Sequence, residues 1–220
     1  MQIIDLSKMR AAIFDVDGTL LDSMWFWDTI AETFLRNAGI EPKPGVRNEV
    51  RELSLLQSAY FFKESYGIKQ SVEDIMRSID LLLENFYFER AELKPGVYDF
   101  LSKLAEKGIP MCIATATDRY LIEAVLKRNR IFDFFGAIFT CSEVTGKDTP
   151  DIFYRAAEFM SSEPKTSFIF EDALYAAETA VRAGFTLVSV YDDSAKEQWR
   201  KLVDISNINV KSFKELEIRP

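Results

Sequence analysis

The chain has 220 residues, of which 48% are hydrophobic and 28% charged, a balance typical of a globular protein that can bury a substantial core. This length suits one large domain, or a domain with an inserted subdomain. The formal net charge of −8 argues against a nucleic-acid partner, because phosphate backbones attract basic surfaces.

The histidine and cysteine content limits the kinds of catalysis that the chain can perform. No histidine occurs, which excludes Ser-His and Cys-His catalytic pairs, histidine metal ligands and a phosphohistidine intermediate. Catalysis would therefore depend on carboxylates, lysines, hydroxyls or a metal ion. The two cysteines, Cys112 and Cys141, lie in apolar, strand-like sequence, which favours buried thiols over a disulfide or a metal site.

The sequence predicts a cytoplasmic protein without a membrane partner. No run of about eighteen apolar residues occurs, so we expect no membrane span. The stretch after Met1 has neither a basic region nor a long apolar segment, which argues against a signal peptide. Both a monomer and a dimer remain open.

A short apolar segment near the start, 11–14, predicts a buried strand that ends in two carboxylates. Asp15 and Asp17 follow it, and Gly18 permits a sharp turn. Like charges at short range raise each other's pKa, so two acids at a buried strand end need compensation. Mg²⁺ is a natural one, since hard cations take oxygen ligands from carboxylates. The alternative is that both aspartates are polar turn residues.

Residues 22–90 predict an all-helical insert. Ser23 can cap its first helix, which contains the aromatic run Trp25-Phe26-Trp27. This run forms either the core of the insert or a wall over a ligand, and in the second case Trp25 and Trp27 contact the substrate. Apolar residues recur at helical spacing further along the insert. The predicted helices are 23–37, 46–65 and 71–89.

From residue 91 onward, strand-like and helix-like segments alternate. This pattern predicts a parallel sheet with helices on both faces, and so an α/β fold. The predicted strands are 110–115, 137–141, 167–171, 186–191 and 208–210, and the predicted helices are 96–107, 118–129, 150–161, 173–182 and 194–202.

Unusual polar residues fall at the carboxyl ends of these strands, where parallel sheets bind ligands. The Thr115 hydroxyl, with the backbone N–H groups of Ala116 and Thr117 at a helix start, can bind an anion such as phosphate. Lys147 can supply a positive charge beside it. Taken singly, Thr115 can equally be a helix cap, and Lys147 a solvated loop charge.

The carboxylates at this edge suit phosphoryl transfer. Asp172 can join Asp15 in holding Mg²⁺, and Asp15 can attack phosphorus to give an aspartyl phosphate. Asp17 can protonate the leaving oxygen and later activate water. Glu171 and Asp172 can also be ordinary polar residues of a turn, but four groups of polar residues at one sheet edge favour a functional site.

Four short motifs of this chain together resemble those of a known family. The stretch 15–23, Asp-Val-Asp-Gly-Thr-Leu-Leu-Asp-Ser, resembles the first motif of the haloacid dehalogenase superfamily, in its phosphatase and phosphomutase branch. Thr115 matches the second motif, Lys147 within Gly-Lys-x-x-Pro-Asp matches the third, and 170–172 match the fourth. The resemblance covers nearly the whole chain.

The resemblance implies a fold with two parts and a role for each matched residue. A Rossmann-like core would comprise 1–21 and 91–220, with a helical cap at 22–90. Asp15 would be the nucleophile and Asp17 the acid/base. The side chains of Asp15 and Asp172 and the backbone carbonyl of Asp17 would hold Mg²⁺, with Glu171 as a supporting neighbour. Dehalogenases of the superfamily lack the second aspartate, so Asp17 favours phosphoryl chemistry.

Some positions depart from the family pattern. Ala173 and Ala176 stand where a serine and a glycine are usual, and Asp148 where a proline is common. We predict a Mg²⁺-dependent phosphatase acting on a small phosphorylated metabolite. The alternatives are a sugar phosphomutase of the β-phosphoglucomutase type and a catalytically weak binding or regulatory protein with the same fold.

Overall fold

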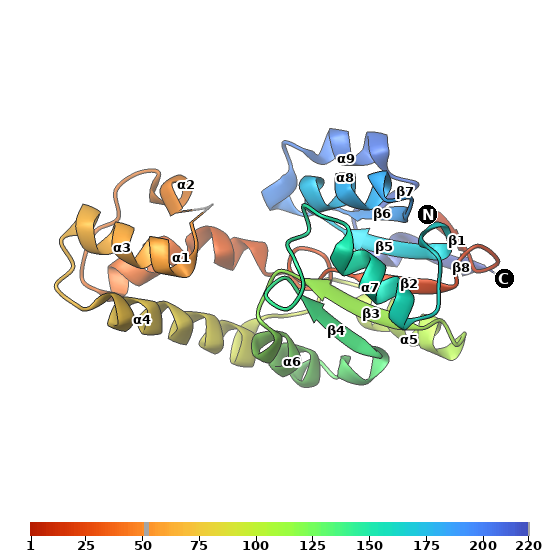
Figure 1. Ribbon diagram of the computed structural model, residues 1–220, viewed down its shortest axis with the longest axis horizontal. Coiled ribbons are helices and arrows are strands. Elements are labelled where there is room, and N and C mark those ends of the chain that lie inside the picture. The colour runs from red at the N-terminus through yellow and green to blue at the C-terminus, as the bar shows by residue number, and fades with distance from the viewer. Residues whose placement is uncertain (51–52, 220) are drawn as a thin grey trace. The chain divides into compact units, whose positions relative to one another are not determined.

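The computed structural model describes residues 1–50 and 53–219, and the chain forms two compact units (Figure 1). The first, here called the α/β unit, comprises Met1–Met24 and the chain from Ala91 onward. The second, called the helical unit, comprises Trp25–Arg90.

The centre of the α/β unit is a six-stranded sheet with the order β4-β3-β2-β5-β6-β7, in which all paired strands run parallel. Buried apolar residues make up most of the middle strands, as expected for a sheet covered on both faces. The predicted α/β fold class is confirmed. The strands are β2 (Ala11–Phe14), β3 (Met111–Thr115), β4 (Ala137–Thr140), β5 (Ser167–Glu171), β6 (Thr186–Val190) and β7 (Ile208–Val210).

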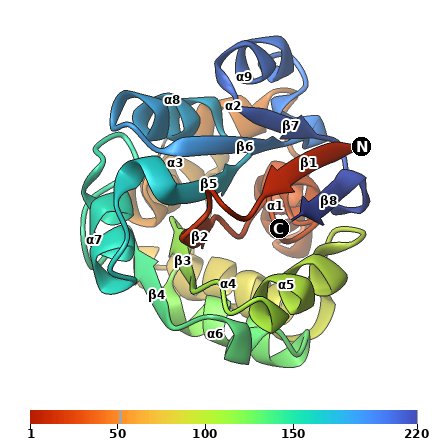
Figure 2. The same cartoon turned by 90° about the vertical axis from the view of Figure 1, so that its right-hand side faces the viewer.

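Helices cover both faces of this sheet, with α7 and α8 on one side and α5 and α6 on the other (Figure 2). Neighbouring residues of β2 point to opposite faces. Ile13 packs in the cluster that includes Ile152 of α7, whereas the Phe14 ring stacks on Phe170 and meets Phe100 of α5 edge-on. The helices of this unit are α5 (Val97–Glu106), α6 (Arg119–Arg128), α7 (Asp151–Phe159), α8 (Leu174–Arg182) and α9 (Trp199–Ile205).

Residues 20–22, which follow β2, pair with residues 92–94, which precede α5, within the α/β unit. The backbone N–H of Asp22 donates to the Glu92 carbonyl at 3.0 Å, and that of Lys94 donates to the Leu20 carbonyl at 2.8 Å. Leu21 and Leu93 form an antiparallel bridge between these bonds. The chain therefore leaves and re-enters this unit at one hydrogen-bonded point.

Two features of the α/β unit differ from the sequence-based expectations. The predicted helix 194–202 is wrong, because the Asp192 carboxylate accepts the Ser194 N–H and starts a short 3₁₀ turn, so that α9 begins only at Trp199. A second, two-stranded parallel sheet pairs β1 (Gln2–Asp5) with β8 (Leu216–Arg219), and the sequence analysis did not predict it. Both strands are short and half exposed, so they lack a continuous apolar run.

The helical unit contains no strand among its described residues, and its aromatic side chains pack together. Phe26 stacks face to face on Phe86, with ring centroids 4.0 Å apart. The last turn of its longest helical stretch is a π-helix, Phe86–Arg90. Over the described ranges, no helix of either unit is long and apolar enough to cross a membrane. The α-helices here are α1 (Met24–Asn37), α2 (Val46–Val50), α3 (Leu55–Tyr66) and α4 (Val72–Asn85).

The predicted single helix 46–65 is wrong, because a new helix begins after Ser54. The Ser54 hydroxyl accepts the Gln57 N–H at 3.3 Å, and the Gln57 side chain accepts the Ser54 N–H at 2.8 Å. This reciprocal capping box satisfies two backbone donors that would otherwise lack partners at the start of α3. Residues 51–52 of the predicted helix lie outside the described residues.

Ser54→Ala should lower the free energy of unfolding by about 1 kcal/mol, because it removes the hydroxyl that caps α3. Urea unfolding followed by circular dichroism measures the change. Ser65→Ala makes the same chemical change at an exposed position inside α3, where alanine favours the helix, and should cost nothing. Equal losses in the two variants would contradict the capping role.

Candidate active site

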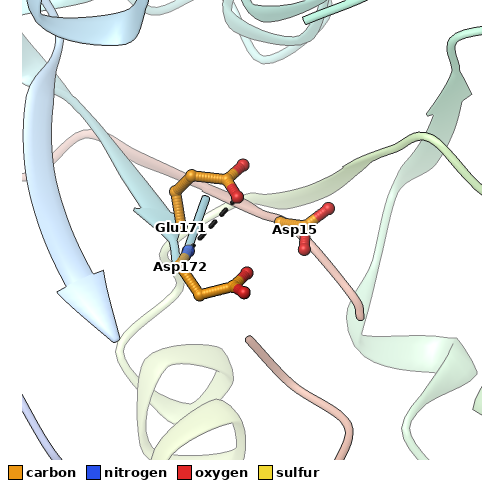
Figure 3. A group of neighbouring side chains, drawn as sticks. All are labelled: Asp15, Glu171 and Asp172. Carbon is orange, nitrogen blue, oxygen red and sulfur yellow. Dashed lines mark hydrogen bonds between the residues drawn. The ribbon is translucent and has the colours of Figure 1, made fainter. Parts of the chain in front are cut away.

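Three carboxylates converge at the carboxyl ends of β2 and β5. These strands are direct neighbours, and the Asp15 N–H donates to the Phe170 carbonyl at 3.0 Å, which places Asp15 beside Glu171 and Asp172. One oxygen from each of these three side chains lies within 4.8 Å of the others (Figure 3). All three residues are buried, so the cluster needs a compensating positive charge.

Lys147 supplies part of that charge. Its ammonium ion-pairs with Asp15 Oδ1 and with Glu171 Oε2, the latter at 2.8 Å, and the residue is 3% exposed. The alternative of a solvated loop charge is therefore wrong. Burial disfavours the charged ammonium, yet the two carboxylates raise the pKa of Lys147 above its ordinary value, so it stays protonated at neutral pH.

One lysine does not neutralise three buried acids. Burial, followed by the charge of Glu171, raises the pKa of Asp15 to about 8 despite the nearby Lys147. Burial and the charges of Glu171 and Asp15 also raise the pKa of Asp172. An oxygen-rich cluster in which carboxylates resist ionisation is suited to a hard divalent cation, which favours the ionised form.

Two hydroxyl groups hydrogen-bond to Asp17. The Ser23 hydroxyl donates to its Oδ1 at 2.6 Å, and the Thr117 hydroxyl donates to its Oδ2 at 2.7 Å. A hydroxyl can donate to an ionised carboxylate or accept from a protonated one. Ser23 and Thr117 can therefore keep Asp17 in one orientation in either protonation state.

The loop after β3, where the sequence predicts an anion site, uses one of its backbone N–H groups internally. Thr115 ends β3 and is 1% exposed, and its hydroxyl accepts the Thr117 N–H at 3.2 Å. The Thr117 amide is therefore used inside the loop, which corrects the expectation that it faces an anion. Ala116 lies between the two threonines at an exposed position.

The turn after β2 packs directly on Asp172. Gly18 has a φ of +78°, and a Cβ at this position would overlap the Asp172 carboxylate. The Thr19 hydroxyl donates to Asp172 Oδ1 at 3.0 Å. A glycine is therefore required here both for the backbone conformation and for the close approach to Asp172.

The departures from the family pattern leave this arrangement intact. The backbone N–H of Ala173 donates to Glu171 Oε1 at 3.1 Å, so the fourth motif keeps a main-chain contact where the serine is missing. Ala176 is fully buried and packs in the core cluster of the sheet. Asp148 is exposed, and its carbonyl accepts the Thr179 hydroxyl at 3.3 Å.

The two tryptophans proposed to contact substrate belong to the helical unit. The Trp27 indole donates to the Tyr87 hydroxyl at 3.0 Å and packs against its ring, so it takes part in the internal packing of that unit. Trp25 is 46% exposed, and its ring lies under the Arg90 guanidinium at 5.6 Å. Contact of either ring with substrate stays a prediction.

Sequence reasoning missed the roles of three hydroxyls. Thr19 and Ser23 lie in the first motif, but the sequence pattern predicts no role for Thr19 and only a helix cap for Ser23. For Thr117 it predicts only a contact through the backbone N–H. The available signal was the presence of Thr19 and Ser23 close to Asp17 in the sequence, since a buried carboxylate needs donors.

A buried lysine between carboxylates, at the carboxyl edge of a parallel sheet, is typical of an active site in an α/β enzyme. A family model described as haloacid dehalogenase-like hydrolase matches residues 9–184. The chain belongs to the haloacid dehalogenase-like hydrolases.

Individual relatives agree with this assignment. The chain is 29% identical over 204 residues to the "Probable pseudouridine-5'-phosphatase" of Drosophila melanogaster, covering 88% of this chain and 86% of that protein. It is 30% identical over 189 residues to (DL)-glycerol-3-phosphatase 2 of Arabidopsis thaliana, covering 82% and 78%. Among solved structures, CbbY from Rhodobacter sphaeroides in complex with xylulose-(1,5)bisphosphate superposes with a TM-score of 0.76 at 20% identity, covering 96% and 97%. The predicted family is confirmed, and the named relatives support the predicted phosphatase activity.

The raised pKa values predict how the metal-free protein responds to pH. The pKa of Asp15 is about 8 in the folded state, against about 3.9 for a free aspartate. Between these values the folded state binds more protons than the unfolded state, so the free energy of unfolding falls as pH rises. In a chelator, urea unfolding should therefore show stability decreasing from about pH 5.5 to about pH 8.

Two comparisons make this test specific. Asp15→Asn removes the titrating group and should flatten the decrease. Added Mg²⁺ should stabilise the protein more at the upper end of this range than at the lower end, because its ligands must be deprotonated. Stability that stays constant or rises across this range in chelator would contradict the raised pKa.

Proposed function

We propose that this protein is a Mg²⁺-dependent phosphatase that releases inorganic phosphate from a small phosphorylated metabolite through an aspartyl phosphate on Asp15. The observation that carries the proposal is the placement of Asp15 in contact with the buried Lys147, beside Asp172 and Glu171. A carboxylate that serves only as a turn residue has no need of a buried cation.

The donor set suits Mg²⁺. Asp15 and Asp172 offer hard carboxylate oxygens, and the family resemblance adds the backbone carbonyl of Asp17. Lys147 offsets one of the three buried negative charges of Asp15, Glu171 and Asp172, which leaves an excess that a divalent cation can balance. When bound, Mg²⁺ would screen the approach of the phosphate dianion and stabilise the charge that develops on its oxygens.

The residues of the site can then carry the reaction in two steps. In the first, an oxygen of Asp15 forms a bond to phosphorus, the bond to the leaving oxygen breaks, and Asp17 gives its proton to that oxygen. In the second, Asp17 takes a proton from water, the water oxygen bonds to phosphorus, and the Asp15–phosphorus bond breaks. Lys147 stabilises negative charge throughout, and the hydroxyls of Ser23 and Thr117 keep Asp17 aimed.

The names of the relatives suggest a substrate class to examine first. One is named for pseudouridine 5'-phosphate and another for glycerol 3-phosphate, both small hydroxyl-rich phosphate monoesters. We propose that the substrate of this chain belongs to the same chemical class, and that the helical unit, through exposed residues such as Trp25, contributes to its selection.

The central test measures phosphate release from a panel of such monoesters. The wild-type protein should release phosphate with Mg²⁺ and lose activity in a chelator. Asp15→Asn should abolish turnover, because an amide is a poor nucleophile, whereas Asp204→Asn, the same change at an exposed position of α9, should leave it unchanged. Full activity in chelator, or wild-type turnover in Asp15→Asn, would contradict the proposal.

The same assay separates a hydrolase from a phosphomutase. The β-phosphoglucomutase group, which this chain resembles, controls water with a histidine in the cap region, and this chain has no histidine. We therefore expect water to be the normal acceptor. Efficient conversion of a hexose 1-phosphate to the 6-phosphate, with a trace of bisphosphate and little phosphate released, would establish the mutase instead.

Thr117→Val tests the acid/base role of Asp17, because it keeps the side-chain shape and removes the bond to Asp17 Oδ2. General acid/base help is worth roughly 10²–10⁴-fold, and part of it depends on orientation. We expect kcat/KM for an alkyl phosphate to fall roughly tenfold, but less than about threefold for p-nitrophenyl phosphate, whose leaving group needs little protonation.

Thr117→Ser retains the hydroxyl and should restore activity on the alkyl phosphate. Equal losses on the two substrates would remove Thr117 from this role, since a general disturbance of the site does not depend on the leaving group.

A further inference from the structure

A second lysine of the α/β unit, Lys94, lies partly buried close to the site, and no motif accounts for it. Lys94 precedes α5, and its side chain is 11% exposed, against 8% for that of Asp192 with which it ion-pairs at 2.8 Å. Its ammonium also donates to the carbonyls of Gly18 and of Tyr191, the latter at 2.8 Å. All three ammonium hydrogens therefore have partners.

Asp192 anchors this lysine in place. Its Oδ2 faces Lys94, and its Oδ1 accepts the Ser194 N–H at 2.9 Å and the Ser194 hydroxyl at 2.7 Å. Both carboxylate oxygens are satisfied. The pair thus joins the loop after β6 to the segment that enters α5.

The bond to Gly18 connects Lys94 to the candidate metal ligands. Gly18 lies between Asp17 and Thr19, and its α-carbon abuts the Asp172 carboxylate so closely that no Cβ fits. The backbone N–H of Lys94 also donates to the Leu20 carbonyl at 2.8 Å. Lys94 therefore donates hydrogen bonds to two carbonyls of the turn after β2, those of Gly18 and Leu20. These residues flank Thr19, whose hydroxyl donates to Asp172.

We propose that Lys94, anchored by Asp192, is a positioning residue for the metal site, which fixes the Gly18 turn so that Asp17 and Asp172 are held ready for Mg²⁺. This inference rests on the proposed Mg²⁺-dependent function. Removing residues that orient metal ligands typically weakens metal affinity 10- to 100-fold.

A role of Lys94 through its charge and a role through its hydrogen bond to Gly18 predict opposite changes in Mg²⁺ affinity when the lysine is replaced. A cation near the site repels Mg²⁺, but Lys94 also lowers the pKa of Asp172, which lessens proton competition for that ligand. At alkaline pH, where this competition is smallest, replacing Lys94 with a neutral residue would tighten Mg²⁺ binding if Lys94 acted only through its charge. If it acts by holding the Gly18 turn, the same replacement weakens binding. The sign of the change therefore identifies the role.

The experiment compares Lys94→Met, Asp192→Asn and the double variant with the wild type, by calorimetric titration of Mg²⁺ into the metal-free protein at alkaline pH, where Asp172 is most readily ionised. Both single variants break the same ion pair, but only Lys94→Met removes the bond to Gly18. We expect Lys94→Met to bind Mg²⁺ at least about tenfold more weakly, and Asp192→Asn to change affinity by less than about threefold.

The double variant guards against misfolding, because it leaves neither charge buried without its partner. It should recover stability in urea unfolding relative to the single variants, and still bind Mg²⁺ as weakly as Lys94→Met. Affinity equal to or tighter than that of the wild type in Lys94→Met and the double variant would overturn the positioning role alone. Absence of Mg²⁺ binding by the wild-type protein would overturn the proposed function, and this inference with it.

Discussion

The double ion pair of Lys147 with Asp15 and Glu171 is the interaction on which the rest of the candidate site depends. Removing an ammonium and two carboxylates from water costs several kcal/mol per ion, and their mutual attraction offsets this cost only when their geometry is good. The sheet provides that geometry, since β2 and β5 are neighbours and end at the same level. Asp172 follows Glu171 directly, so the same strand pairing that satisfies Lys147 also creates the excess of negative charge.

The two candidate catalytic aspartates are held by different kinds of partner. Asp15 contacts a buried cation, whose charge favours the ionised carboxylate without outweighing burial, so that full ionisation for attack on phosphorus requires the further charge of a bound cation. Asp17 accepts hydrogen bonds from the hydroxyls of Ser23 and Thr117, and these groups tolerate either protonation state. Two acids one residue apart are thus suited to separate tasks by their surroundings, which is a general way to divide nucleophile from acid/base.

Much of the sheet and of the site could be predicted from the sequence, because short apolar runs ending in Asp15, Thr115 or Glu171 carry strong local signals. The burial of Lys147 could not, since a lysine in a loop is exposed unless distant strands place acids beside it. The start of α3 at Ser54 was missed because helical spacing of apolar residues continues through that point, and only the capping contacts reveal the break. Lys94 and Asp192 lie far apart in the sequence, and neither has a neighbour that signals a pair.

The hydrogen-bonded pairing of 20–22 with 92–94 has a consequence for how such a chain can evolve. The backbone hydrogen bonds between 20–22 and 92–94 lie within the α/β unit, at the point where the helical residues are inserted. These bonds hold the two ends of the insert side by side, whatever its sequence or length. The entropy of closing a loop grows only slowly with its length, so an insert at such a junction can be lengthened, shortened or exchanged at small cost to the sheet. Natural selection can therefore revise the inserted segment while the chemistry at the strand ends is inherited unchanged.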